Sequence, residues 1–292
     1  DPNLPQINHL LSSIGACKCF SLLDLNQGFF QIPLDEESKK YTVTRTPWGY
    51  IQFNVMMMGC ANSPGAFQGA MNYAFRGLIG NGVLVYIDDI LIHAKSLDHH
   101  TELLEAVLKR CLRYNLWVKG TKSKICRKEL DYLGFRLSTD GVHVKPDFVQ
   151  GIRDFPNPSP SGSHLQSFMG CANFYSRHVK DLALLLAPLH DLLSAYQAAL
   201  KNKGKRQVKH RNTAILPSRI EPLWKEVWLP EHTAAMQRVK EALMSAAKLA
   251  HADYSKPFIL YTDASTQGLG AALHQTDKDG NKVMNPNAKS SW

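Results

Sequence analysis

Residues 83–92 consist of two short apolar runs separated by a polar break. Val83-Leu84-Val85 precedes the break and Ile90-Leu91-Ile92 follows it. Strand-like apolar residues on both sides of a two-residue break predict a β-hairpin with Asp88 and Asp89 at its tip. Two carboxylates on a rigid tip can hold a hard divalent cation such as Mg²⁺, which takes oxygen ligands. A plain turn is the alternative, since aspartate is also a favoured turn residue.

The elements on both sides of this hairpin predict how it is packed. Residues 19–25 read as a buried strand, and apolar stripes at helical spacing predict helices over 63–78 and 98–116. Residues 130–137 follow as another strand. Strand, helix, hairpin, helix, strand is the order of a split βαβ unit. The predicted fold class is therefore α+β, an antiparallel sheet with helices on one face.

Asp24 ends the first predicted strand, and a split βαβ sheet makes that strand a neighbour of the hairpin. Asp24 can therefore converge on Asp88 and Asp89. Three carboxylates in a partly buried site repel one another unless cations offset their charge. Two Mg²⁺ ions, or Mn²⁺ in their place, about 3.5–4 Å apart would clamp the attacking and leaving oxygens of an in-line phosphoryl displacement. The predicted chemistry is nucleotidyl transfer, in which a 3′-hydroxyl attacks an α-phosphate and pyrophosphate leaves.

Composition limits the class of protein and of partner. The net charge of +9 and the pI near 9.2 favour a polyanionic partner such as nucleic acid. No apolar run has the length of a membrane span, and the first residues lack a signal-peptide pattern. The six cysteines include no Cys-x-x-Cys pair. We therefore expect reduced thiols in an intracellular protein, without structural zinc.

The second half of the chain changes character at the proline-spaced residues 156–160, which predict a domain boundary. Residues 163–194 are mostly helical. Residues 195–230 lose their periodicity and are expected to form a basic linker or surface insertion. Its basic side chains could follow phosphates, and a solvated disordered loop is the alternative. They are Lys201, Lys203, Lys205, Arg206, Lys209 and Arg211.

Residues 20–32 resemble the first catalytic motif of reverse transcriptases, and are most similar to those of gypsy-type LTR retrotransposons. Four other stretches follow in the order that the family has, and a later stretch resembles the helix after the palm. The similarity covers about residues 1–194 and resumes at 233–275. These stretches are Thr46-Pro47-Trp48-Gly49, Asn62-Ser63-Pro64-Gly65-Ala66-Phe67-Gln68, Tyr86-Ile87-Asp88-Asp89, Tyr132-Leu133-Gly134-Phe135, and residues 168–177.

The resemblance implies an RNA-directed DNA polymerase, part of a retrotransposon Pol polyprotein, with a right-hand polymerase fold. It implies a palm with partial fingers over 1–150, a thumb-like helical region over 151–194, the linker over 195–230, and a truncated ribonuclease H-like α/β domain over 231–292. Implied partners are an RNA or DNA template-primer, dNTPs, and the protease, ribonuclease H and integrase of the same polyprotein. The implied location is intracellular, in the cytoplasm, a virus-like particle or the nucleus.

Two other functions remain as alternatives. One is a catalytically inactive remnant that binds nucleic acid. The other is a different two-metal palm enzyme, such as a nucleotide cyclase, against which the thumb-like helices and the ribonuclease H resemblance argue.

The resemblance also implies roles for single residues. Asp24, Asp88 and Asp89 would be the metal ligands, with the Leu25 carbonyl as a further ligand. Phe29 would lie under the sugar of the incoming nucleotide, where its ring excludes a 2′-hydroxyl. An ordinary core aromatic is the alternative for Phe29.

Three weaker assignments complete the implied polymerase site. Leu133-Gly134 match the turn that grips the primer terminus, with a strand bend as the alternative. Lys124 resembles the lysine that protonates the leaving pyrophosphate, with a solvated lysine as the alternative. Met58 and Gly59 stand where the family usually has Pro-Phe-Gly or Pro-Gln-Gly, and Met58 would pack beneath the sugar.

Both ends of the sequence carry an expectation. Residues 261–273 resemble the first hairpin of ribonuclease H, and Asp263 would be the first of its metal-binding carboxylates. One carboxylate cannot hold two cations, so we expect no ribonuclease H activity. The family's upstream fingers strands, whose basic residues hold the triphosphate, do not precede Asp1. Losing two such contacts removes roughly 3–6 kcal/mol of binding, so we expect this fragment to polymerise poorly.

Overall fold

In a computed structural model of the chain, the described residues are 4–179, 181–207, 224, 227–246, 256–265, 268–276 and 282–291. They fall into two compact units. One unit contains Asp1–His143 with Leu249–Trp292, and the other contains Val144–Lys248. None of the described helices is both long and apolar enough to cross a membrane.

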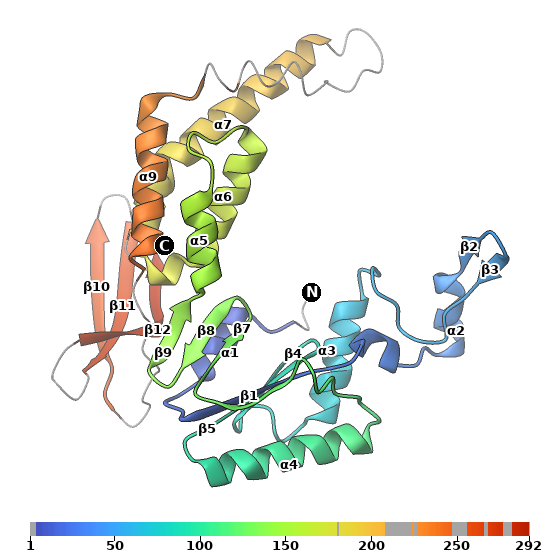
Figure 1. Cartoon of the computed structure of the whole chain (residues 1–292). Helices are drawn as coiled ribbons and strands as arrows, with labels where there is room; N and C mark the ends of the chain where they lie inside the picture. The colour runs from blue at the N-terminus through green and yellow to red at the C-terminus, as the bar shows by residue number, and fades with distance from the viewer. Residues whose placement is uncertain are drawn as a thin grey trace. The chain divides into compact units, whose positions relative to one another are not determined.

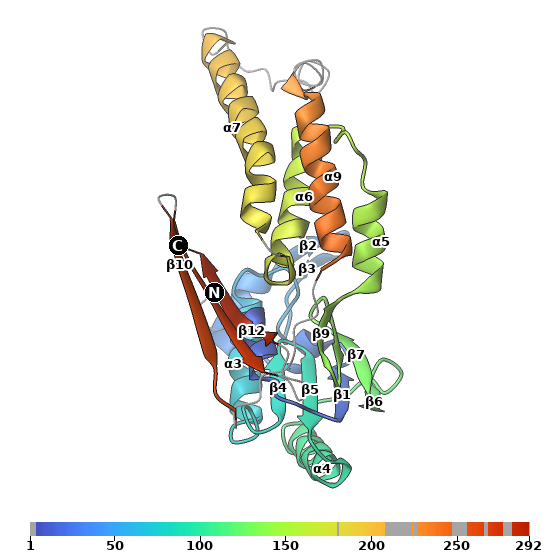
Figure 2. The same ribbon diagram turned by 90° about the vertical axis from the view of Figure 1, so that its left-hand side faces the viewer.

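A four-stranded sheet forms the centre of the first unit, with strand order β4-β5-β1-β6. β1 pairs antiparallel with both β5 and β6, and β4 pairs antiparallel with β5. Helices α3 and α4 pack on this sheet (Figures 1 and 2). The predicted split βαβ arrangement is confirmed. Its elements are β1 (Cys19–Asp24), α3 (Ser63–Ala74), β4 (Val83–Tyr86), β5 (Asp89–Ala94), α4 (Leu97–Arg113) and β6 (Lys124–Arg127).

The core of this unit lies between the sheet and the two helices. Leu23 of β1 and Ile90 of β5 belong to one buried cluster with Phe67 of α3 and Val107 of α4. Side chains alternate along a strand, so residues next to these face the other way. Asp24 and Asp89 therefore lie on the sheet face opposite the helices.

The segment between β1 and α3 consists of short elements. Its hairpin of β2 and β3 is strongly exposed: the side chain of Trp48 at its turn is 92% exposed. These elements, together with the N-terminal helix, are α1 (Ile7–Ser13), η1 (Gly28–Gln31), α2 (Glu36–Lys39), η2 (Lys40–Thr42), β2 (Thr44–Thr46) and β3 (Gly49–Ile51).

The strand predicted over residues 130–137 is instead a hairpin. β7 (Glu129–Tyr132) turns at Leu133-Gly134 into β8 (Phe135–Ser138), and β9 (Gly141–Val144) completes a three-stranded sheet. Leu133 and Gly134 both have positive φ, 47° and 86°. Two-residue hairpin turns of this handedness favour asparagine or glycine. Because an apolar leucine occupies the first turn position, residues 130–137 read as one continuous strand in the sequence.

The second unit is a helical bundle built around Phe168, Leu189, Trp224 and Met236, all of which are buried. Lys240 is buried as well, and its ammonium donates to the carbonyls of Arg153, at 3.1 Å, and Phe155 at the end of α5. The helices are α5 (Pro146–Asp154), α6 (Gly162–Phe174), η3 (Ser176–His178), α7 (Leu182–Gln207) and α9 (Pro230–Met244).

The prediction of a linker over 195–230 is wrong for residues 195–207 and for Trp224. Helix α7 continues to Gln207, because lysine, arginine and glutamine are good helix formers. Trp224 is 2% exposed, its indole N–H donates to the Ser159 carbonyl at 2.8 Å, and its ring contacts Tyr196. Lys209 and Arg211 lie outside the described residues.

The predicted hairpin near the C-terminus is present as β10 (Ile259–Ser265) and β11 (Gly268–Thr276). A third strand, β12 (Lys282–Ser291), pairs antiparallel with β11. Asp263 lies in β10 opposite Gly270. Helix α9 falls within the residues 231–292 for which a ribonuclease H-like domain is implied, but it belongs to the unit that ends at Lys248 rather than to the unit that contains these strands.

Candidate active site

The structure brings Asp24, Asp88 and Asp89 to one end of the central sheet. Asp24 and Asp89 are directly paired across β1 and β5. Asp88 lies in the two-residue turn between β4 and β5. The backbone N–H of Leu25 donates to the Asp88 carbonyl at 3.3 Å, which ties the end of β1 to this turn. All three aspartates are partly exposed, so solvent and substrate can reach them.

The electrostatics of this group fit a divalent cation. Burial, followed by the charges of Asp88 and Asp24, raises the pKa of Asp89 to about 6, and Lys122 opposes the shift. The Lys122 ammonium lies 3.8 Å from the Asp24 carboxylate. Within the described part of the chain, the three carboxylates do not all approach within 4.8 Å of one another. One ammonium beside three carboxylates leaves an oxygen-rich, negatively charged site of the kind that Mg²⁺ prefers.

Removing the charge of Asp89 should stabilise the metal-free protein above pH 6. The folded-state pKa of about 6 exceeds the ordinary 3.8, so folding is disfavoured as pH rises through that window. A shift of this size is worth about 3 kcal/mol in full, and partial exposure reduces the expected gain to about 1–2 kcal/mol. We expect Asp89→Asn in a chelator to unfold at higher urea than wild type at pH 7.5, and by a much smaller margin at pH 4.

Two observations would test the cause of this effect. Millimolar Mg²⁺ should narrow the difference between the two proteins, because it binds the folded wild-type carboxylates. A difference that is the same at pH 4 and pH 7.5 would show that the pKa of Asp89 is not its source.

Gln68 of α3, to which the sequence assigned no role, holds the tip of the β4–β5 hairpin. Ile87 has φ +54°, a rare conformation for a β-branched residue. The Ile87 N–H donates to Gln68 Oε1 at 2.7 Å, and Gln68 Nε2 donates to the Val85 carbonyl at 3.2 Å. Gln68 is completely buried in α3. The Gln68 amide therefore fixes the strained turn that carries Asp88. In the sequence, a glutamine within an apolar helix stripe was the available signal for this role.

Phe29 lies in η1 beside this tip. Its ring centroid is 5.0 Å from that of Phe67, and its side chain is only partly buried at the edge of the core. An aromatic at a core edge is compatible with both the sugar-gate role and the core role. The role of Phe29 stays a prediction.

Gly28 is the point of closest approach between η1 and the hairpin. A Cβ there would meet Phe67 Cζ at 2.9 Å and Asp88 Cβ at 3.3 Å. Phe67 is completely buried and has little room to move. The absence of a side chain at this position therefore lets η1 approach Phe67 and the hairpin turn at Asp88 this closely.

Gly28→Ala should damage both stability and catalysis. Overpacking of this kind costs about 1–3 kcal/mol, and a displacement of about 1 Å at a reacting group lowers a rate by up to about 100-fold. Urea unfolding and primer extension measure the two effects. Gly69→Ala is the matched control, because a Cβ there meets nothing within 4 Å. Equal results for the two variants would contradict the proposed close packing.

The lysine nearest to the aspartates is Lys122 rather than the predicted Lys124. Lys124 is exposed on β6, opposite Leu22. The segment around Lys122 is bound to the end of β1, since the N–H of Lys119 donates to the Asp24 carbonyl at 2.7 Å, and the Asp24 N–H donates to Ser123 Oγ at 3.3 Å. Proton donation by Lys124 stays a prediction. The position of Lys122 beside Asp24 was not predicted from the sequence.

A buried tyrosine next to Asp89 was also missed. Tyr132 of β7 is 1% exposed, and its hydroxyl has no hydrogen-bond partner among the described residues. Burial, followed by the charge of Asp89, raises the pKa of Tyr132. Tyr132 and Asp89 are brought close by tertiary packing, because they lie on β7 and β5, which belong to different sheets.

The remaining predicted site residues lie on turns and loops. Leu133 is partly buried and Gly134 exposed in the β7–β8 turn. Met58 is 55% exposed, and Gly59 has φ +89°. Leu25 is buried and bridged to Val118. Primer, nucleotide and metal contacts by these residues stay predictions.

Comparison with known families and relatives gives a consistent result. Residues 1–137 match the family described as reverse transcriptase (RNA-dependent DNA polymerase). Residues 228–288 match an RNase H-like domain found in reverse transcriptase. The retrovirus-related Pol polyprotein from transposon gypsy of Drosophila melanogaster is 31% identical over 273 residues, which are 93% of this chain and 25% of the relative. The enzymatic polyprotein of Cauliflower mosaic virus is 30% identical over 273 residues, 93% of this chain and 36% of the relative.

Solved structures share the fold. The foamy viral protease-reverse transcriptase in complex with RNA/DNA hybrid has a TM-score of 0.74 at 23% identity, over 99% of this chain and 35% of that chain. Its dRH form in complex with double-stranded DNA has a TM-score of 0.76 at 24% identity, over 98% of this chain and 45% of that chain. The chain spans between about a quarter and a third of the curated relatives quoted above.

Proposed function

Residues 1–137 belong to the reverse transcriptase (RNA-dependent DNA polymerase) family, and from this premise we propose that the chain is part of a retrotransposon Pol polyprotein that catalyses RNA-directed DNA synthesis. The matching relatives are transposon and viral polyproteins. Residues 1–143 would supply palm and partial fingers and residues 144–227 the thumb. Residues 228–288, which hold α9, β10, β11 and most of β12, would form a ribonuclease H-like part. We place its action inside the cell, in the cytoplasm, a virus-like particle or the nucleus.

The pairing of Asp24 with Asp89 across β1 and β5, beside Asp88 at the hairpin tip, carries this proposal. The three carboxylates would hold the divalent cations, Mg²⁺ in the first place and Mn²⁺ as the alternative. Bound cations would activate the primer 3′-hydroxyl and stabilise the charge that develops on the leaving pyrophosphate. The protein would fix the carboxylates through the sheet register and through the clamp that Gln68 makes on the turn.

Other residues would hold the substrates. Phe29 would contact the deoxyribose, and Leu133-Gly134 the primer terminus. Lys122 balances part of the negative charge at Asp24. The excess of positive charge, +9 over the whole sequence, favours the polyanionic template-primer. The solved neighbours are themselves complexes with RNA/DNA hybrid or double-stranded DNA, which supports the same class of partner here.

Primer extension tests the proposal. The full chain is mixed with a DNA primer on an RNA template, four dNTPs and Mg²⁺. We expect slow but measurable elongation of the primer, complete loss of elongation with a chelator, and recovery when Mg²⁺ is added in excess. Asp263→Asn is the control, because that aspartate lies in β10 of the ribonuclease H-like strands and should leave extension unchanged.

The alternative function gives a different result. A folded protein that binds the template-primer in a salt-sensitive manner, but extends nothing with either Mg²⁺ or Mn²⁺, would be a nucleic-acid-binding remnant. That outcome would reject the enzymatic proposal for this chain.

A further inference from the structure

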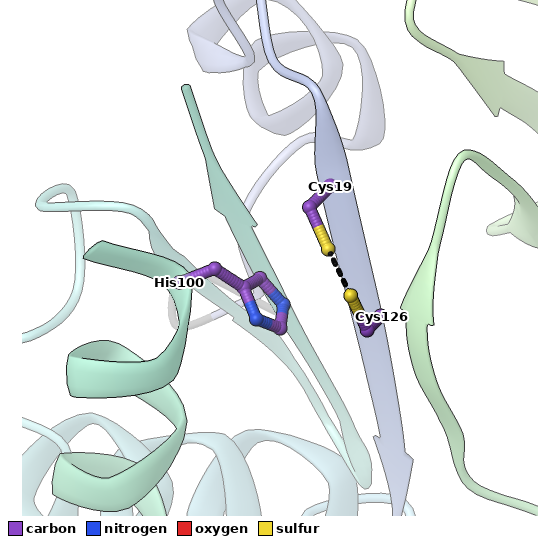
Figure 3. Close-up of side chains that lie close together, drawn as sticks. All are labelled: Cys19, His100 and Cys126. Carbon is purple, nitrogen blue, oxygen red and sulfur yellow. Dashed lines mark hydrogen bonds between the residues drawn. The ribbon is translucent and has the colours of Figure 1, made fainter. Parts of the chain in front are cut away.

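Three potential metal ligands meet at the end of β1 that is remote from Asp24. Cys19 is the first residue of β1, Cys126 lies on the neighbouring edge strand β6, and His100 lies in α4. The two sulfur atoms are 2.9 Å apart although the residues are 107 positions apart in sequence. One ligand atom from each of the three side chains lies within 4.8 Å of the others (Figure 3). The sequence contains no motif that predicts this cluster.

A buried serine organises the cluster. Ser21 is completely buried, and its hydroxyl lies 3.0 Å from His100 Nε2. The same hydroxyl accepts the backbone N–H of Cys126 at 2.8 Å. Cys126 has φ +49° and lies where the β1–β6 register is irregular. Outer partners of this kind orient first ligands in metal sites.

The chemistry of the three side chains selects a soft or borderline cation. Two thiols and an imidazole are typical ligands of zinc, whereas carboxylates suit magnesium. His100 is 1% exposed, and its ring lies beside both thiols, where a neutral imidazole can act as a metal ligand. In an intracellular protein, two thiols in contact are more typical of metal binding than of a structural disulfide.

The geometry requires small adjustments. Zinc–sulfur bonds of about 2.3 Å at a tetrahedral angle place two sulfurs about 3.8 Å apart. The present separation of 2.9 Å must therefore widen. Cys126 is exposed on an edge strand, so rotation of its side chain can supply the change. Its exposure also allows water to reach a fourth position.

The cluster is separate from the aspartates. Cys19 precedes Asp24 by five positions on the same strand, a distance of about 16 Å at the usual rise per residue. Cys19 also faces the helices, whereas Asp24 faces away from them, because side chains alternate. Hard carboxylates at one end of β1 and soft thiols at the other would bind different metals.

We propose that Cys19, His100 and Cys126 form a binding site for a zinc-like divalent cation, with water as the remaining ligand, that fastens α4 to β1 and β6. Such a site goes beyond the polymerase function and does not depend on it. A cation bound there would restrain three elements at once. The site would thereby add stability to the sheet that carries Asp24 and Asp89.

Cobalt titration of the full chain tests the site. The protein is reduced, stripped of metal with a chelator, and titrated with Co²⁺. We expect one equivalent to give a near-ultraviolet thiolate-to-cobalt band with the visible bands of tetrahedral coordination. Zn²⁺ should abolish the bands and Mg²⁺ should not. In Cys126→Ser the affinity should fall at least about 100-fold.

Matched variants separate this site from other metal binding. Cys60→Ser, at an exposed cysteine outside the cluster, and Asp88→Asn should both keep the cobalt bands. Zn²⁺ should raise the melting temperature of wild type but not of Cys126→Ser, which circular dichroism must show to be folded. The proposal is overturned if wild type gives no thiolate band, or if Cys126→Ser gives the wild-type titration. Recovery of Cys19 and Cys126 in one peptide, lighter by two hydrogen atoms and without metal, would mean a disulfide instead.

Discussion

Replacing Asp88 by asparagine is expected to lower the rate of primer extension by at least about 10³-fold. The amide has the same size as the carboxylate but lacks the charge that would hold a divalent cation beside Asp24 and Asp89. Asp88 lies at the hairpin tip with its side chain partly exposed, so the fold should survive the change. The loss should appear in kcat, measured by single-turnover extension at saturating dNTP.

The affinity for template-primer distinguishes a catalytic from a structural effect. Removal of one negative charge should leave binding unchanged or strengthen it, because the partner is a polyanion. Asp98→Asn is the matched control, since Asp98 is an exposed aspartate in the first turn of α4. If Asp88→Asn extends primers at the wild-type rate, or if it loses template binding in parallel with extension, the assigned metal-binding role is wrong.

Phe29→Val is expected to admit ribonucleotides. The aromatic ring is proposed to block the space that a 2′-hydroxyl would occupy, so a smaller side chain removes a repulsive contact rather than an attractive one. We expect the ratio of kcat/KM for dNTPs to that for ribonucleotides to fall by about 100-fold, equivalent to about 2.7 kcal/mol. The measurement is competitive incorporation on the same template-primer.

If Phe29 is an ordinary core aromatic, Phe29→Val should change stability but not sugar selectivity. Its ring packs against Phe67, so Phe29→Val should also cost about 1–3 kcal/mol of unfolding free energy in either case. Phe30→Val, at the next residue of η1, is the matched control for general damage to this helix. A loss of stability with unchanged sugar selectivity would make Phe29 an ordinary core aromatic.

Several features of the fold could be predicted because they are local. The hairpin of β4 and β5 follows from two apolar runs around a two-residue break, and the spacing of the apolar residues gave α3 and α4. Periodicity alone missed the β7–β8 turn, which only the resemblance implied, because Leu133 adopts a positive φ that its residue type does not favour. The end of α7 was missed because a lysine-rich stretch resembles both a solvated loop and a solvated helix.

The same distinction applies to the candidate site. The spacing of Asp24, Asp88 and Asp89, read with the element order, predicted that they meet, and the strand register places them together. A glutamine within an apolar helix stripe marked Gln68 as unusual, but the sequence could not show which turn Gln68 supports. Nor could it show that Lys122 rather than Lys124 lies next to Asp24, or that Tyr132 is buried beside Asp89. Each of these contacts depends on side-chain positions across elements, about which sequence periodicity carries no information.

The sequence by itself predicted the strand, helix, hairpin and helix within residues 19–116, the resemblance to reverse transcriptases and the meeting of the three aspartates, because periodicity and short motifs are properties of neighbouring residues. Only the tertiary structure decided which distant side chains meet. Cys19 and Cys126 show this most clearly: they have no recognisable spacing, yet the pairing of β1 with β6 puts their sulfurs 2.9 Å apart. The physical reason is that close packing joins residues according to the register of strands and the faces of helices, and not according to their separation along the chain.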